Sequence, residues 1–531
     1  MPKNLLYLIK KLILNNKNII FYLVVSSILL YFYRYSYRQD LISYLSISDK
    51  YYNGNFNQAI NGVWGPLLSW VLALFRFLPI EPILGFKFVQ ILIGAITLIG
   101  INILFTIFDF QNYLKKCLTF SSIWIIYYYV FLTGTPDLLL ACILLFLMIL
   151  FLKWENGKIR FQIIAGVLGA LLYFAKPYGF PAFILLYVGF NIISSWQRRK
   201  FADANAIKSI FVGLLIFGIL VSPWIYLLSS KYNKFTVSTG GNYNFAIVGP
   251  TYDGKHIPRI EKLYEPVNET ATSYWEDPTF LDVKSWSPFE SFENFSHLFS
   301  NVYKNIFDLI LFCTISSPFI FLLIFTINPK KVFKKINTRI LGLFALGYIS
   351  GLLLLFIHSR FLIVIQFILI VLTGSYLLIS VEKFVAIEYL RKVIIIFVCL
   401  SLSFQPVYSI LKNLNDGKEI YVLSEKLKNH LSIKGNIASV STTPLEEDWG
   451  NSLTLSYLLN ARYFGEVDRK LDITSLYKEL IESEIDYYFV WDNEQNINNN
   501  KFHLVFRESV KDLHPILKRD SSKELMVYLI K

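Results

Sequence analysis

Apolar stretches long enough to cross a lipid bilayer recur along most of this chain, and they constrain its fold more than any other feature of the sequence. A helix must supply about 20 predominantly apolar residues to span a hydrocarbon core about 30 Å thick. Hydrophobic residues make up 54% of the 531 residues and charged residues only 17%. The sequence therefore predicts an all-α polytopic membrane bundle.

The distribution of the basic residues explains the net charge of +13 without a nucleic-acid partner. They gather in alternate connections between the apolar stretches, as expected when positively charged loops stay on the cytoplasmic side. These connections lie at residues 3–17, 115–116, 153–160, 198–200, 330–339 and 383–392. The pattern predicts a multi-pass protein of the cytoplasmic (inner) membrane whose N-terminus is inside.

About eleven membrane spans are predicted within residues 1–411, which form a transmembrane module. The spans are expected at about 18–35, 83–108, 117–132, 138–153, 161–175, 178–195, 207–228, 305–327, 339–357, 361–380 and 392–411. One further apolar stretch, 65–78, is short and is bracketed by Pro66 and Pro79. We expect it to form a helix that lies along the membrane surface.

Two longer connections are predicted on the outer side of the membrane. The first external loop, 36–82, has a tyrosine-rich polar run followed by the segment GVWGPLLSW. The long external loop, 229–303, is acidic in its middle, and aromatic residues are interleaved with its polar ones. Both loops are too polar to cross the bilayer, so they are candidates for binding a substrate outside it.

The composition changes at about residue 415 to that of a soluble domain, and the eleventh span places residues 415–531 outside. Apolar runs predict strands and helical periodicity predicts helices in this part of the chain. The strands are expected at 436–441, 486–491 and about 526–530, and the helices at 450–460 and 473–484. The C-terminus is therefore predicted to be a small extracytoplasmic α/β domain. Its sequence has no Gly-rich phosphate loop and no nucleophile elbow.

Four charged residues lie where predicted spans reach the outer surface: Asp40, Asp137, Lys176 and Arg360. A charge at the edge of a membrane is costly and needs a partner or a function. Each alone could be an ordinary helix-end residue. Two acids and two bases on one side of the membrane, on short turns that a bundle could bring together, instead indicate a site for a phosphate and a hydroxyl group.

The order of these features resembles the GT-C class of polyprenyl-phosphate-sugar-dependent glycosyltransferases, and most of all the branch with the protein O-mannosyltransferases and the aminoarabinose transferase of lipid A. The matching segments are RQDLISYLSISDKYYNG with Asp40, NGVWGPLLSW, TGTPDLLLACILLF with Asp137, FAKPYGFP with Lys176, and HSRFLIVIQF with Arg360. The resemblance implies inverting transfer of a sugar from a polyprenyl-phosphate donor to a hydroxyl of a cell-envelope acceptor, which is a protein, a lipid or a glycan.

The same resemblance implies a role for each charged residue. Asp40 would act as the catalytic base, and Lys176 and Arg360 would bind the donor phosphate. Asp137 would orient the site, or would hold a divalent metal ion together with Asp40. Where the aminoarabinose-transferase branch has an acidic residue followed by Lys and Pro, this chain has Trp64-Gly65-Pro66. The metal ion is therefore left open, and no cofactor is assigned.

Six further residues are possible substrate contacts: Tyr44, Trp64, Trp275, Glu276, Trp286 and His358. Tryptophan faces could stack on sugar rings, although aromatic residues that pack a loop against itself would look the same in sequence. His358 is included because it stands two residues from Arg360. Asp49 competes with Asp40 as an acid of the first loop, and its position favours a solvated or capping residue.

Two alternatives to a transferase share the lipid-linked sugar. A transporter or flippase would more often show inverted repeats and charges near the middle of the bilayer, whereas the charges here lie at its outer edge. A polymerase or ligase of envelope polysaccharide would act on the same side, but the long external loop is acidic rather than basic in its middle. The expected partners are thus a polyprenyl-phosphate-linked sugar, an envelope acceptor and the lipid bilayer.

Overall fold

The computed structural model describes residues 17–155, 158–197, 204–252, 262–281, 283–320, 323–324, 336–441, 446–491, 500–511, 515 and 522–530. The basic segments predicted at 3–16, 198–200 and 330–335 lie outside the described residues. Contacts divide the chain into two compact units. The helical unit comprises Met1–Tyr31, Lys87–Val237 and Ser287–Leu411, and the loop–sheet unit comprises Phe32–Phe86, Ser238–Trp286 and Lys412–Lys531.

A helix stands at each of the predicted spans. These helices are α2 (Lys17–Tyr33), α6 (Pro82–Ile107), α7 (Asn112–Leu132), α8 (Asp137–Leu152), α9 (Ile159–Ala175), α10 (Gly179–Gln197), α11 (Ala204–Lys231), α13 (Phe292–Ser316), α16 (Ile336–Leu353), α17 (Ile363–Phe384) and α18 (Glu388–Lys412). Among the described residues, six helices are long and apolar enough to cross a membrane. Shorter apolar helices accompany them, and the predicted polytopic bundle is confirmed.

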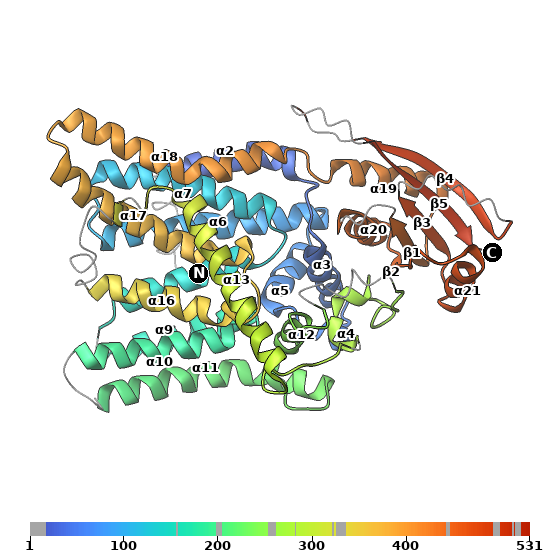
Figure 1. Cartoon of the computed structure of the whole chain (residues 1–531), viewed down its shortest axis with the longest axis horizontal. Helices are drawn as coiled ribbons and strands as arrows, with labels where there is room; N and C mark the ends of the chain where they lie inside the picture. Colours follow the sequence, from blue (N-terminus) through green and yellow to red (C-terminus); the bar gives the residue numbers. More distant parts are fainter. Residues whose placement is uncertain are drawn as a thin grey trace. The chain divides into compact units, whose positions relative to one another are not determined.

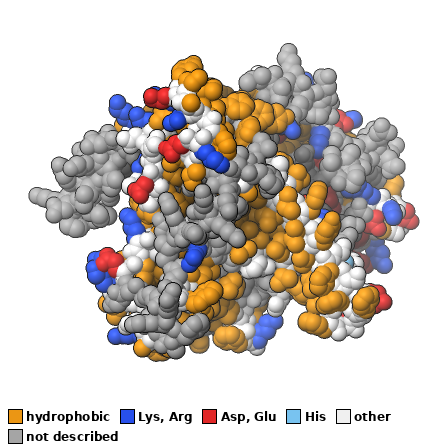
Figure 2. Space-filling model, turned by 60° about the vertical axis from the view of Figure 1, so that its left-hand side comes forward, with side chains coloured by type: hydrophobic (Ala, Val, Ile, Leu, Met, Phe, Trp, Pro, Cys, Tyr) orange, Lys and Arg blue, Asp and Glu red, His pale blue; other side chains and the backbone are white. Residues whose placement is uncertain are grey.

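The helices of the bundle expose apolar side chains that a water-soluble protein would bury. Helices α9, α10 and α11 lie side by side (Figure 1), and α11 leaves Phe211 and Ile219 more than half exposed. The same holds for Phe404 on α18. Broad hydrophobic areas with few charges are also visible in Figure 2. Such surfaces are stable against lipid tails, which fits a bundle of membrane spans.

The eighth predicted span, 305–327, is wrong in its bounds. Helix α13 begins at Phe292, within the stretch assigned to the long external loop, because Ser291 caps it by accepting a hydrogen bond from the Asn294 backbone N–H at 3.1 Å. It ends at Ser316, because Ser317 precedes a proline and leaves the helical region, with backbone angles of φ −146° and ψ 74°. The apolar run alone did not reveal either signal.

The loop–sheet unit is built around a five-stranded sheet with the order β2-β1-β3-β5-β4. Its strands are β1 (Asn436–Ser441), β2 (Arg462–Glu466), β3 (Tyr487–Trp491), β4 (Phe502–Lys511) and β5 (Ser522–Ile530). Strands β1, β2 and β3 are parallel, and β5 pairs antiparallel with β3 and β4. The helices beside them are α19 (Lys418–Leu431), α20 (Glu446–Leu458) and α21 (Ile473–Glu482). The predicted α/β domain is confirmed, although the sequence did not predict α19, β2 or β4.

The segments from the first external loop form short helices rather than an open loop. They are α3 (Gln39–Tyr52), α4 (Phe56–Ala59) and α5 (Pro66–Phe75). Helix α5 corresponds to the short apolar stretch 65–78, and Pro66 occupies its first turn, where no backbone N–H is needed. Helix α3 is the tyrosine-rich polar run, and it is buried over most of its circumference.

The middle of the long external loop, residues 238–286, also belongs to the loop–sheet unit. It contributes α12 (Gly240–Ile247) and the short helices η2 (Tyr274–Glu276) and η3 (Pro278–Phe280). The Tyr463 backbone N–H donates to the Thr272 carbonyl and the Tyr264 N–H donates to the Phe464 carbonyl, both at 2.7 Å. The loop therefore runs along strand β2. By composition the soluble domain begins at about residue 415, but by contacts its unit also includes the first external loop and residues 238–286 of the long one.

Candidate active site

The first cluster of candidate residues surrounds Asp40, in the first turn of α3. A carboxylate is favoured there by the exposed backbone N–H groups of a helix N-terminus. The indole Nε1–H of Trp275 donates a hydrogen bond to Asp40 Oδ1 at 3.2 Å. Asp40 comes from the first external loop and Trp275 from the long one, so the structure joins two predicted site residues that are far apart in sequence.

Aromatic rings surround Trp275 in edge-on arrangements. Its ring centroid lies 6.1 Å from that of Trp64, 6.0 Å from that of Tyr243 and 6.1 Å from that of Trp449. Tyr44 packs edge-on against Trp64 at 5.3 Å and is itself buried. Tyr44 therefore contributes to packing, and substrate contacts by Tyr44, Trp64 and Trp275 stay predictions.

Glu276 is placed in an ion pair that the sequence did not predict. Its carboxylate bonds the Lys50 ammonium and accepts from the Ser46 hydroxyl at 2.6 Å. Its backbone carbonyl accepts from Asn61 Nδ2 at 2.7 Å and from Trp64 Nε1 at 2.9 Å. Lys50 and Glu276 side chains are each only 2% exposed. Glu276 therefore ties α3 to the turn before α5, and an acceptor contact by its side chain stays a prediction.

Replacing Glu276 with glutamine is expected to destabilise the protein by about 2 kcal/mol. The buried Lys50 ammonium loses its counter-charge, but the glutamine amide oxygen can still accept its hydrogen bond. Thermal unfolding of the purified protein checks this. The matched control is Glu482→Gln, which alters an exposed pair with Lys478 and should leave the melting temperature unchanged. Equal melting temperatures for both variants would contradict a stabilising role for the buried pair.

Trp286 lies in a packed part of the same unit. Its ring stacks on Phe245 with centroids 4.9 Å apart and planes 7° from parallel. Its Nε1–H donates to the Phe245 carbonyl at 2.6 Å. One face of the indole is thus covered by α12, and a sugar contact by Trp286 stays a prediction.

A second cluster, in the helical unit, contains the other three predicted charges. Asp137 is the first residue of α8 and is 1% exposed. Lys176 Nζ lies 2.5 Å from Asp137 Oδ1, and the Thr135 hydroxyl donates to Oδ2. Lys176 follows the last residue of α9 and has extended backbone angles, because Pro177 comes next. The proline thus ends α9 at the position where the lysine meets Asp137.

Arg360 belongs to the short helix η4 (Ser359–Leu362), which begins after His358. The His358 ring Nδ1 accepts a hydrogen bond from the Arg360 backbone N–H at 3.3 Å. Phe361 lies beside both predicted phosphate-binding cations. Lys176 Nζ is 4.5 Å from its ring centroid, and Arg360 Cζ is 5.1 Å from it. The structure thus gathers Asp137, Lys176 and the η4 segment.

Two buried polar residues of α6 support the turn that carries Asp137, and sequence reasoning missed them. Lys87 Nζ donates to the Phe131 carbonyl at 2.9 Å, and Gln90 Nε2 donates to the Thr135 carbonyl at 3.0 Å. They lie inside an apolar run, three residues apart on one helix face. An ionisable residue within a span is a signal of function, and Lys87 could have been found that way.

The surroundings of Asp137 do not fit a metal ligand. Both of its oxygens are hydrogen-bonded, and one partner is an ammonium group. A divalent cation beside that ammonium would be repelled. Within the described ranges no three His, Cys, Asp or Glu side chains gather as a metal site would require. No catalytic step is therefore assigned to a metal ion.

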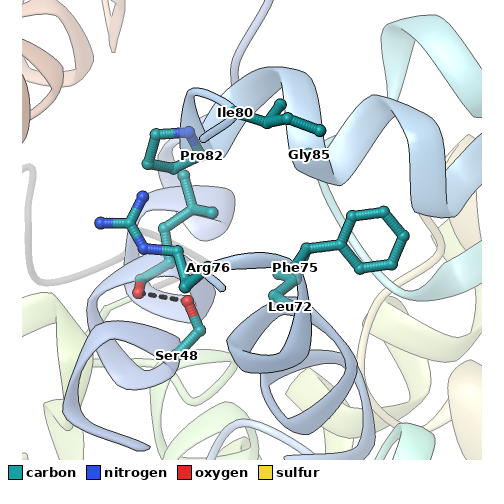
Figure 3. A pocket seen from close by; sticks show the side chains of 8 residues that line it. Ser48, Leu72, Phe75, Arg76, Ile80, Pro82 and Gly85 are labelled. Atoms are coloured by element: carbon teal, nitrogen blue, oxygen red, sulfur yellow. Dashed lines mark hydrogen bonds between the residues drawn. The ribbon is translucent and has the colours of Figure 1, made fainter. Parts of the chain in front are cut away.

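Asp49 is bonded rather than solvated, so the sequence-based interpretation of it is wrong. The Arg76 guanidinium lies 2.7 Å from Oδ1, and the Tyr457 hydroxyl donates to Oδ2 at 2.9 Å. Arg76 also borders a small, mostly apolar pocket with Leu72, Phe75 and Ile80 (Figure 3). Asp49 therefore links α3 to the end of α5 and to α20.

The pKa of Asp49 gives a pH-dependent prediction. Burial raises the pKa of this carboxyl, and the nearby Arg76 opposes the rise only in part. A carboxyl whose pKa is raised on folding stabilises the fold while protonated, and this contribution is lost as pH rises through the folded pKa. Asp49→Asn cannot titrate at this position and serves as the reference. The melting temperature of the wild type minus that of Asp49→Asn should be larger at about pH 4 than at about pH 7. A difference in melting temperature that is constant with pH would contradict this.

No protein-family model matches the chain, and no curated protein matches it. Among solved structures, the chain is similar to ArnT from Cupriavidus metallidurans in the apo state, with a TM-score of 0.56 and 10% identity over 96% of this chain and 97% of that chain. It is also similar to ArnT from the same organism bound to undecaprenyl phosphate, with a TM-score of 0.52, 10% identity and the same coverage. At this identity the likeness establishes the fold. The expectation is confirmed at the level of the fold: nearly the whole chain has the fold of ArnT.

Proposed function

We propose that this protein is an inverting membrane glycosyltransferase that moves a sugar from a polyprenyl-phosphate donor to a hydroxyl of a cell-envelope acceptor. The main support is its end-to-end likeness to an ArnT that was solved with undecaprenyl phosphate bound. The protein would work in the cytoplasmic membrane, with its active site and C-terminal domain on the outer face. The acceptor is a protein, a lipid or a glycan, and no nucleic acid takes part.

Asp40 is the proposed base. It removes the proton of the acceptor hydroxyl as that oxygen attacks the anomeric carbon of the donor sugar. The new carbon–oxygen bond forms on the face opposite the phosphate, so the configuration inverts and the bond to the phosphate oxygen breaks. The proton stays on Asp40 until water removes it. The position at a helix N-terminus and the indole donor both favour the ionised carboxylate that this role needs.

Lys176 and Arg360 are proposed to stabilise the polyprenyl phosphate as it leaves. The leaving oxygen gains negative charge in the transition state, and cations fixed in advance stabilise it without reorganising. Lys176 is held by Asp137 on one side and by the Phe361 ring on another. Asp137 is thus proposed to orient the lysine, and the His358 ring to hold the start of η4, which contains Arg360.

The test is donor cleavage by the purified protein in lipid. A synthetic undecaprenyl-phosphate hexose, labelled in the sugar, is supplied with and without an envelope extract. We expect release of undecaprenyl phosphate that depends on the extract, with the label found on an acceptor. Movement of intact donor across the vesicle membrane without cleavage would contradict the proposal and support a flippase. Label found only in lengthening glycan chains would support a polymerase or ligase instead.

A further inference from the structure

We infer that Trp275 and Trp449 are positioning residues for Asp40, and that helix α20 of the C-terminal domain is therefore a working part of the active site. This inference rests on the proposed function, in which Asp40 is the base. It assigns a role to a domain that carries no catalytic motif of its own. All the residues involved belong to the loop–sheet unit.

The contact between Trp275 and Asp40 can fix the direction of the carboxylate. Indole Nε1–H is a donor only, and an ionised carboxylate is an acceptor only, so the bond has one possible polarity. It holds one oxygen of Asp40 at 3.2 Å. Trp275 is 7% exposed, so its ring has little freedom to turn away. A base that must meet a hydroxyl within hydrogen-bond distance benefits from such restraint.

Trp449 of α20 holds the segment that carries Trp275. Its indole Nε1–H donates to the Tyr274 hydroxyl at 3.1 Å, and its ring meets that of Trp275 edge-on at 89°. Tyr274 is 1% exposed and adjoins Trp275 in η2. The restraint on Asp40 therefore runs from α20 through η2 to α3.

Helix α20 also contacts α3 near both of its ends. The Tyr37 hydroxyl, just before α3, donates to Asn451 Oδ1 at 2.8 Å. The Tyr457 hydroxyl donates to Asp49 near the other end at 2.9 Å. Between them, an added Cβ at Gly450 would displace the Gln39 side chain, which lies next to Asp40 in the sequence. The C-terminal domain thus contacts, through α20, the helix that carries the proposed base.

Conservative variants separate positioning from folding. Trp275→Phe removes the N–H but keeps a ring, and we expect kcat to fall about tenfold with little change in KM. Loss of a donor to the carboxylate should also move the acid limb of the kcat/KM profile upward by about one pH unit. Trp449→Phe and Tyr274→Phe should move it in the same direction by less. If Trp275→Phe does not fold, these two variants carry the test.

The matched control is Trp491→Phe, which removes another buried indole bond in the same unit, to Ser452 Oγ at 2.8 Å. It should leave the pH profile at its wild-type position. If Trp275→Phe and Trp449→Phe both show the pH profile of the wild type, in an assay in which Asp40→Asn is inactive, this inference is overturned and the proposed function still stands. An inactive wild type, or a fully active Asp40→Asn, would instead overturn the proposed function on which it rests.

Discussion

Replacing Asp40 with asparagine is expected to lower kcat for sugar transfer by about 10³-fold, while KM for the donor changes little. Asparagine keeps an oxygen that can accept the Trp275 N–H, so the local packing survives. It cannot take a proton from the acceptor hydroxyl, so the attacking oxygen stays a weak nucleophile. Single-turnover release of undecaprenyl phosphate measures the effect on the chemical step directly.

The control for this variant lies on the same helix. Asp49→Asn makes the same chemical change near the other end of α3, where the side chain bonds Arg76 and Tyr457. It should keep most of the transfer activity. Equal rates for wild type and Asp40→Asn would remove Asp40 from the mechanism, and an inactive Asp49→Asn with active Asp40→Asn would exchange their roles.

Replacing Lys176 with methionine is expected to affect both stability and catalysis. Asp137 is 1% exposed, and loss of its ammonium partner leaves a buried carboxylate without a counter-charge. Breaking a buried pair in this way costs about 3–5 kcal/mol. Sugar transfer should also fall by about 10²-fold, because a cation is removed from the developing phosphate charge. Thermal unfolding and donor cleavage measure the two effects separately.

The double variant Asp137→Asn with Lys176→Met separates these contributions. It removes both charges, so much of the lost stability should return, while transfer should stay low. Lys426→Met serves as the surface control, because its pair with Glu508 is partly exposed and should contribute less than about 1 kcal/mol. Restored transfer in the double variant would show that Lys176 acts only on Asp137 and does not bind the phosphate.

The sequence predicted the parts of the fold that depend on local pattern. Each predicted span has its helix, because a long apolar run dictates a helix in lipid whatever its neighbours are. Strand β1 was predicted with its observed bounds, because it is a short buried run. Strand β4 was missed because it is mostly exposed and shows no clean alternation.

What the sequence did not determine is which distant side chains meet. The polar run 39–52 has the composition of a loop, yet it is a buried helix, since Ser46 and Lys50 meet their partner Glu276 only after η2 folds against it. The ion pair of Asp137 and Lys176 likewise needs α8 and α9 to pack together. The sequence alone therefore determined the membrane bundle, the C-terminal α/β domain and the candidate charges. Only the tertiary structure decided their partners, because burial and hydrogen bonding between distant segments depend on packing that local periodicity does not encode.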